Sequence, residues 1–189
     1  MKKTESHYLK HHLLIAMPHL DDPNFAHRLV YLVEHGPDGA MGLVVNHPGG
    51  LCLADILEQI RPEPAPPARC QQIPVYTGGP VQTERGFVLH PPGGHYQATL
   101  GLGELDLTSS QDILFAIADG QGPDRYLIAL GYAGWEAGQL EREVAANTWL
   151  TCPAREDLLF ELPAEQRLAA AAASLGINLG LLSSQAGHA

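Results

Sequence analysis

Apolar runs and turn residues predict paired strands in the first part of the chain. Residues 13–17 form one short apolar run, and residues 27–34 form another with apolar side chains on both faces, typical of a strand covered on both sides. Residues 35–39 have the composition of a turn, and a further apolar run follows over 40–46. The pattern therefore predicts a β-hairpin across residues 27–46.

The pattern changes to helical spacing at residues 53–60, where Leu53, Ile56, Leu57 and Ile60 share one face. The proline-rich stretch that follows predicts an extended loop, in which we expect Cys70 to be exposed. Further strands are expected at 75–76, 85–90, 98–107 and 125–133.

Helices are expected in the remaining segments. Ser109 is the predicted N-cap of one helix, with Asp112 three residues later. A second helix contains Leu140 and Val144, with Glu136 in its first turn, and Glu143 suited to polar contacts at its end. After Trp149 we expect only helices and short loops, with Pro163 opening the longest helix.

Direct strand pairing in the first half and alternation of strands with helices in the second half favour a mixed α/β or α+β fold. The length of 189 residues suits a single domain over 1–189, and residues 1–12 read as a flexible lead-in. No internal repeat is present.

Composition and charge reduce the range of possible functions. Hydrophobic residues make up 45% of the chain, which is ample for a core, and the net charge is −10. Nucleic-acid binders usually carry a basic face, so this charge argues against direct DNA or RNA binding and against an anionic membrane surface. A small anionic ligand or a protein remains open as a partner, and the oligomeric state is left open.

Three cysteines without a CxxC pair match neither a disulfide framework nor a zinc motif. The ten histidines include no HxH or HExxH spacing, so we expect no metal and no cofactor. The apolar runs are too short for a signal sequence or a membrane span, and we expect a cytoplasmic protein.

Polar residues at the ends of the hairpin strands are candidates for chemistry. Glu34 and His35 end one strand, and Asn46 ends its neighbour. An imidazole beside a carboxylate is an acid–base unit, which makes Glu34, His35 and the later His90 catalytic candidates. The alternative, which we favour, is hydrogen bonding at turns and edges.

A glycine turn precedes a basic residue farther along the chain. Gly78 and Gly79 could present N–H groups, and Arg85 a guanidinium, to an anion. With Asn46 they form the predicted ligand-binding set, although tight-turn geometry is the explanation of the glycines that we favour. No phosphate loop, dinucleotide fingerprint or serine nucleophile elbow is present.

Five segments together resemble the AlgH/YqgE family. They are PHLDDPNFAHRLVYLVEHGPDGAMGLVVNHP, YTGGPVQTERGFVLH, LTSSQDIL, LGYAGWEAGQLEREVAANTWL and LSSQAGHA. The resemblance implies a bifurcated sheet, part of it curled into a small barrel, surrounded by helices. It implies little about activity, although some members are described as transcriptional regulators. Val33 and Asn178 differ from the residues common in the family, which weakens a family-wide thiol or carboxylate role here.

Two functions follow as hypotheses. The first is a non-enzymatic cytoplasmic protein with a regulatory or ligand- or protein-binding role that affects transcription indirectly. The alternative is an enzyme or anion-binding module with a polar cleft, lined by Glu34, His35, Asn46, Arg85 and His90.

Overall fold

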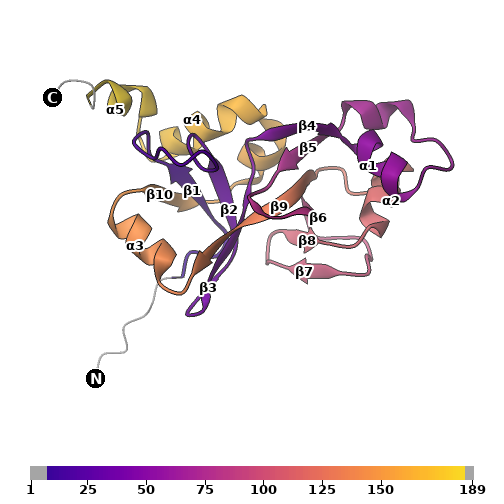
Figure 1. The fold of residues 1–189 in the computed structure, drawn as a ribbon, viewed down its shortest axis with the longest axis horizontal. Coiled ribbons are helices and arrows are strands. Elements are labelled where there is room, and N and C mark those ends of the chain that lie inside the picture. Colours follow the sequence, from indigo (N-terminus) through magenta and orange to yellow (C-terminus); the bar gives the residue numbers. More distant parts are fainter. Residues whose placement is uncertain (1–7, 186–189) are drawn as a thin grey trace.

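One ten-stranded sheet runs through the computed structural model, which describes residues 8–185 (Figure 1). The main path has the order β10-β1-β2-β3-β9-β6-β8-β7, and β4 and β5 branch from β9. The strands are β1 (His12–Ala16), β2 (Leu29–Gly36), β3 (Gly39–Val44), β4 (Pro48–Cys52), β5 (Pro74–Thr77), β6 (Val81–His90), β7 (Thr99–Gly101), β8 (Asp106–Thr108), β9 (Leu127–Glu136) and β10 (Trp149–Pro153).

The long strand β9 is where the sheet divides. Its first half pairs in parallel with β5 through Leu130 and antiparallel with β6, whereas its second half pairs with β3 from Ala133 onward. Gly131 lies between the two halves with φ of +75°, a backbone conformation suited to glycine. The bifurcated sheet and its curled half-barrel, from β3 round to β7, confirm the predicted fold class.

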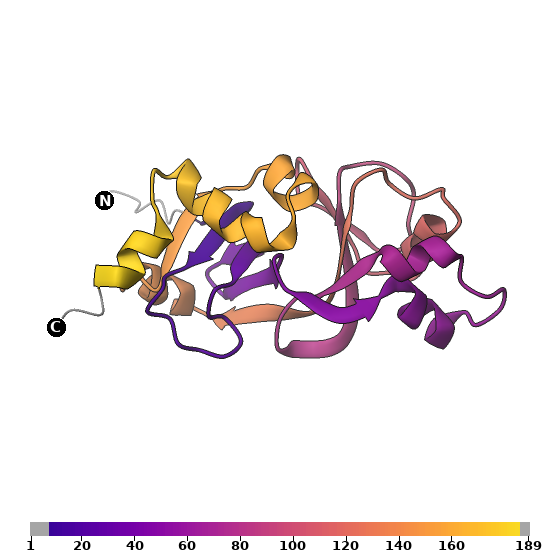
Figure 2. The ribbon, with the colours of Figure 1, turned by 90° about the horizontal axis from the view of Figure 1, so that it is seen from above.

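Helices cover the two ends of this sheet. They are α1 (Leu53–Ile60), α2 (Asp112–Ala118), α3 (Gln139–Ala145), α4 (Ala164–Ser174) and α5 (Leu179–Gln185), with a 3-10 turn at Ala68–Gln72 and a π-helical turn at Asp157–Glu161. Figures 1 and 2 place α4 and α5 at one end, with α4 against β1, and α1 and α2 at the other. Within residues 8–185, every helix is too short or too polar to cross a membrane.

Three apolar clusters form the core. The largest fills the half-barrel and reaches α4, with Tyr31, Phe87 and Leu107 among its members. A second lies beneath α1 and α2. The third packs α3 against β1, β2 and β3, and it contains both tryptophans, Trp135 and Trp149. The apolar sides of the elements therefore meet as the hydrophobic pattern requires.

The predicted hairpin and the first predicted helix are confirmed. Strands β2 and β3 pair antiparallel around a tight turn, with a bulge between Leu32 and Glu34. The first helix has the predicted bounds, and Asp55 caps it by accepting the Cys52 N–H at 2.8 Å. The helix that follows Pro163 is also present, as α4.

Several local predictions were wrong. The expected strand at 98–107 is two short strands, β7 and β8, since Leu102 N–H donates to Leu105 O and turns the chain. Ser109 is no N-cap: its N–H donates to Ala98 O, and Gln111 precedes the helix. Cys70 is fully buried rather than exposed, because the 3-10 turn folds it beneath α1.

Two further corrections concern the second half. The segment after Trp149 is the strand β10, paired with β1, and not a helix. Glu136 ends β9 and precedes the helix, which begins at Gln139 with Gly138 as its N-cap. Residues 1–7 of the predicted lead-in lie outside the described residues, whereas Leu9 and His11 from its second half are hydrogen-bonded to β2.

Candidate functional site

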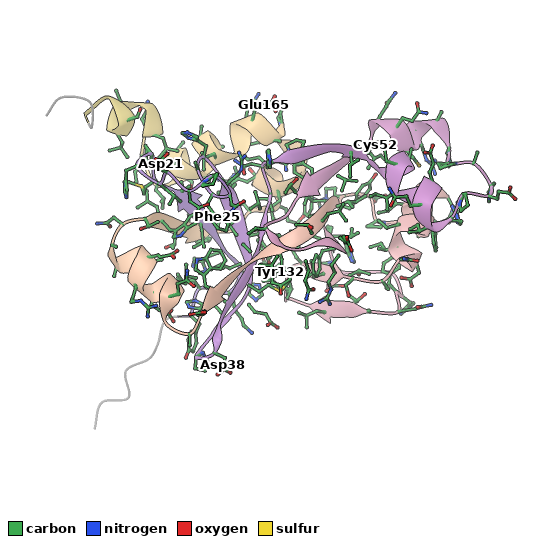
Figure 3. The ribbon with its side chains drawn as sticks, viewed as in Figure 1. Asp21, Phe25, Asp38, Cys52, Tyr132 and Glu165 are labelled. Carbon is green, nitrogen blue, oxygen red and sulfur yellow. The ribbon has the colours of Figure 1, made fainter. Side chains whose placement is uncertain are left out.

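The open end of the half-barrel holds a cavity of about 490 Å³, which we call the half-barrel mouth. Side chains from successive strands of the curled sheet line it, and Tyr132 on β9 lies near the centre of the molecule (Figure 3). The lining residues are Val33, Glu34, Met41, Arg85, Phe87, Ala98, Thr99, Leu100, Leu107, Ser109 and Tyr132.

Glu34 and Arg85 bring opposite charges to the walls of this cavity. Arg85 is exposed, its Nη1 donates to Gln82 Oε1 at 3.4 Å, and its Cζ lies 5.1 Å from the centre of the Phe87 ring. Among residues 8–185, no carboxylate lies within 4 Å of Arg85, and the Glu34 carboxylate has no hydrogen-bond or ion-pair partner. Both charged groups are therefore available to a ligand.

The floor of the mouth is apolar. Phe87 is buried and meets Tyr132 edge-to-face, with ring centres 6.1 Å apart. Leu107 is also buried, and Met41 packs against the same cluster. A cavity with an apolar floor and a few polar groups at fixed places is typical of small-molecule sites.

A chain of hydrogen bonds connects the buried His90 to Thr108 and Thr99. His90 Nδ1 lies 2.8 Å from Pro91 O, which can only accept, so Nδ1 carries the proton. Its Nε2 then accepts from the Thr108 hydroxyl at 2.8 Å. Because Thr108 has donated its single hydroxyl proton, the Thr99 hydroxyl donates to Thr108 Oγ1, also at 2.8 Å. His90 is fully buried, and its partner Thr108 lies on the face of β8 opposite Leu107 and the floor of the mouth.

His35, another catalytic candidate, forms hydrogen bonds that hold neighbouring segments together. Its Nδ1 accepts the Leu9 N–H at 2.9 Å, so Nε2 carries the proton and donates to Glu141 Oε1 at 3.0 Å. The ring is buried, and Tyr8 packs edge-on against it at 5.3 Å. Glu141, on α3, has a lowered pKa because of its backbone hydrogen bond and its bond to His35. These contacts fix the incoming chain and α3 to the hairpin.

Asn46 and Gly78 form hydrogen bonds with neighbouring backbone groups. Asn46 Oδ1 accepts the Leu29 N–H at 2.9 Å, and its Nδ2 donates to His27 O at 3.0 Å. The Gly78 N–H donates to Leu130 O at 2.8 Å. A Cβ at Gly78 would lie 2.3 Å from Gly131 O, so this glycine is in close contact with β9.

The five residues of the predicted cleft therefore do not meet at one place. Glu34 and Arg85 share the half-barrel mouth. His35 lies beside Glu34 in a more open cavity at the hairpin turn. Neither Asn46 nor His90 lines these two cavities. The residues that the prediction missed are Met41, Thr99 and Tyr132, which carry no motif and are brought together only by strand pairing.

A further cavity, of about 230 Å³, lies at another edge of the half-barrel. The Tyr31 hydroxyl shares a hydrogen bond of 3.2 Å with His11 Nδ1 on its wall, and Glu104 and Arg155 lie at its rim. Burial, and then the charge of Glu104, raise the pKa of Tyr31 to about 12. The pKa of His11 is lowered, chiefly by burial.

The raised pKa of Tyr31 predicts a loss of stability in alkali. The unfolded chain releases the Tyr31 proton near pH 10, whereas the folded chain holds it until about pH 12, so the stabilisation present below pH 10 is lost as the pH rises between these values. We expect the phenolate absorbance of the native protein to lag behind that of the unfolded chain. Tyr31→Phe should remove part of this lag, and Tyr126→Phe another part, since burial raises that pKa too. An unchanged lag in Tyr31→Phe would contradict the assignment.

Metal and thiol chemistry have little support in the described residues. Between residues 8 and 185, no three His, Cys, Asp or Glu side chains are grouped to hold a metal ion. The three cysteines are free thiols. Burial raises the pKa of Cys70 and of Cys152, which disfavours their reactive thiolates.

Comparison with known proteins shows to which family the chain belongs. A family model described as AlgH-like matches residues 13–180. The chain belongs to the AlgH-like family. UPF0301 protein AlgH of Pseudomonas aeruginosa is 66% identical over 189 residues, and a UPF0301 protein of Stutzerimonas stutzeri is also 66% identical. Both alignments cover 100% of each chain. The resemblance seen in the five sequence segments is thereby confirmed.

Solved structures agree with this membership. The solution structure of AlgH from Pseudomonas aeruginosa matches with a TM-score of 0.81 at 66% identity, covering 100% of both chains. A crystal structure of a Corynebacterium diphtheriae protein matches with a TM-score of 0.69 over 97% of this chain and 94% of that one. At 18% identity the second match shows a shared fold alone. The bifurcated half-barrel fold therefore occurs in proteins with very different sequences.

Proposed function

We propose that this AlgH-like protein is a non-enzymatic, cytoplasmic binding protein with a regulatory role, and that the half-barrel mouth holds its small ligand. The observation that carries the proposal is a pair of opposite charges, Glu34 and Arg85, above an apolar floor in one cavity, neither of which forms an ion pair within residues 8–185. A volume of about 490 Å³ lies within the range of small-molecule sites, roughly 300–1,000 Å³.

The hydrogen bonds of the two histidines favour binding over catalysis. A general base must have a nitrogen free to take a proton from a bound substrate. Both ring nitrogens of His35 are engaged, with Leu9 and Glu141. Both nitrogens of His90 are engaged as well, with Pro91 and Thr108.

Charge and thiol content support the rest of the proposal. A net charge of −10 favours an effect on transcription through a ligand or a protein partner rather than through direct contact with DNA. Free thiols at Cys52, Cys70 and Cys152 suit the reducing cytoplasm.

Thermal-shift screening against metabolites, nucleotides and metals tests this function. A ligand present at about 100 times its Kd should raise the melting temperature of a chain of this size by roughly 5–10 °C. Arg85→Ala and Glu34→Ala should reduce the rise for any ligand of the mouth. The matched control is Arg142→Ala, because Arg142 is exposed on α3 and does not line the mouth. If every rise is the same in Arg85→Ala, Glu34→Ala and wild type, the ligand site is elsewhere and the proposal fails.

A further inference from the structure

We propose that the ligand of the half-barrel mouth is a free α-amino acid with an apolar side chain. This inference rests on the proposed function and names the ligand class of that same site. Two features of the cavity carry it: the two opposite charges on its walls and the apolar floor.

The charges select a zwitterion. A ligand with only a carboxylate or phosphate would gain a contact with Arg85 but would be repelled by Glu34, which lines the same cavity. A ligand with only an amine would meet the reverse problem at Arg85. An α-amino acid carries both charges at pH 7, so its carboxylate can face the guanidinium while its ammonium group faces the carboxylate.

Arg85 is placed to bind a carboxylate. Its side chain lies over the Phe87 ring, which leaves it partly preorganised above the cavity. Its hydrogen bond to Gln82 Oε1, at 3.4 Å, is long and uses a single N–H. Other N–H groups of the guanidinium are therefore free for two parallel bonds to a carboxylate.

The floor selects the side chain. Met41, Phe87 and Leu107 line the cavity and belong to the main apolar cluster. Leu100 at the edge strand β7 is 45% exposed, and it also lines the mouth. Burying an apolar side chain against these groups is favourable at about 25 cal/mol per Å². A leucine-, methionine- or phenylalanine-like side chain fits this surface, whereas a charged one does not.

Calorimetric titration of the full chain tests the inference with one matched set of probes. Leucine, methionine and phenylalanine represent the ligand class. Isocaproate is leucine without the amine, and isoamylamine is leucine without the carboxylate. We expect leucine to bind at least about tenfold more tightly than either analogue, which corresponds to one lost charged contact of about 1.4 kcal/mol.

Variants assign the contacts. Arg85→Ala should weaken leucine to the level of isoamylamine, and Glu34→Gln should weaken leucine while improving isocaproate. The control Arg142→Ala should leave every affinity unchanged.

The outcomes separate the two proposals. If isocaproate binds as tightly as leucine, or if Glu34→Gln leaves their ratio unchanged, the zwitterion inference is overturned. If no amino acid binds but another screened compound does so in an Arg85-dependent manner, the ligand class is wrong and the proposed function stands. If leucine binds Arg85→Ala and Glu34→Gln as tightly as it binds the wild-type protein, both proposals fail.

Discussion

Replacing Gly79 with alanine should lower the free energy of unfolding by about 3 kcal/mol or more, and we expect little folded protein. Gly79 has φ of +155°, and a Cβ there would lie 2.1 Å from the Tyr132 carbonyl carbon and 2.4 Å from the Ala133 nitrogen. Both are backbone atoms of β9, so neither can rotate away. Denaturant unfolding followed by circular dichroism measures the loss.

Two alanine controls separate space from backbone strain. Gly36→Ala meets no atom within 4 Å and should change stability by less than about 0.5 kcal/mol. Gly50→Ala also meets no atom, but its φ of +82° should cost about 1 kcal/mol. A Gly79→Ala protein as stable as Gly36→Ala would mean that these glycines are not packed as described. The prediction that Gly78 and Gly79 present their N–H groups to an anion would then be favoured over tight packing.

The success of the hairpin and α1 predictions has a local cause. The hairpin over residues 27–46 contains both its strands and its turn within twenty neighbouring residues, and Leu53–Ile60 contains its own apolar face and its cap residue, Asp55. Such patterns are complete within the segment, so no distant contact is needed to interpret them.

The errors concern segments whose structure is set by distant partners. The segment Trp149–Pro153 is a strand because β1, more than a hundred residues earlier, offers it an edge. Cys70 is buried because α1 and α2 close over a loop whose composition is typical of the surface. Propensity and spacing carry no information about such contacts, and tertiary packing overrides them.

The candidate site shows the same division. Glu34 and Arg85 were identified because charged residues at strand ends stand out in a sequence, and the structure brings them to one cavity. Tyr132 was missed because its place in the cavity comes from its contact with Phe87 on β6, the strand that pairs with β9. A lone tyrosine in a predicted strand has no chemical signature of its own.

Replacing Glu143 with alanine is the second large effect that we expect, at about 3 kcal/mol of lost stability. Glu143 Oε2 accepts the indole N–H of Trp135 at 2.9 Å and that of Trp149 at 2.8 Å. Both tryptophans are buried, so alanine would leave two donors unsatisfied between β9, β10 and α3. The two hydrogen bonds to the indoles confirm the predicted polar contacts of Glu143, although its partners could not be predicted from the sequence.

Fluorescence makes the test specific, because Trp135 and Trp149 are the two tryptophans of the chain. Their indoles lie edge-to-face at 6.1 Å, and Phe25 stacks on Trp135 at 6.0 Å. Glu143→Ala should therefore shift the native emission as well as the unfolding midpoint, since the charge beside both indoles disappears.

Two control variants accompany this test. Glu143→Gln keeps an acceptor oxygen and should cost roughly 1 kcal/mol of stability. Glu136 is exposed, and Glu136→Ala should cost less than about 0.5 kcal/mol. Equal stabilities of Glu143→Ala and Glu136→Ala would show that the shared carboxylate does not hold α3 on the sheet.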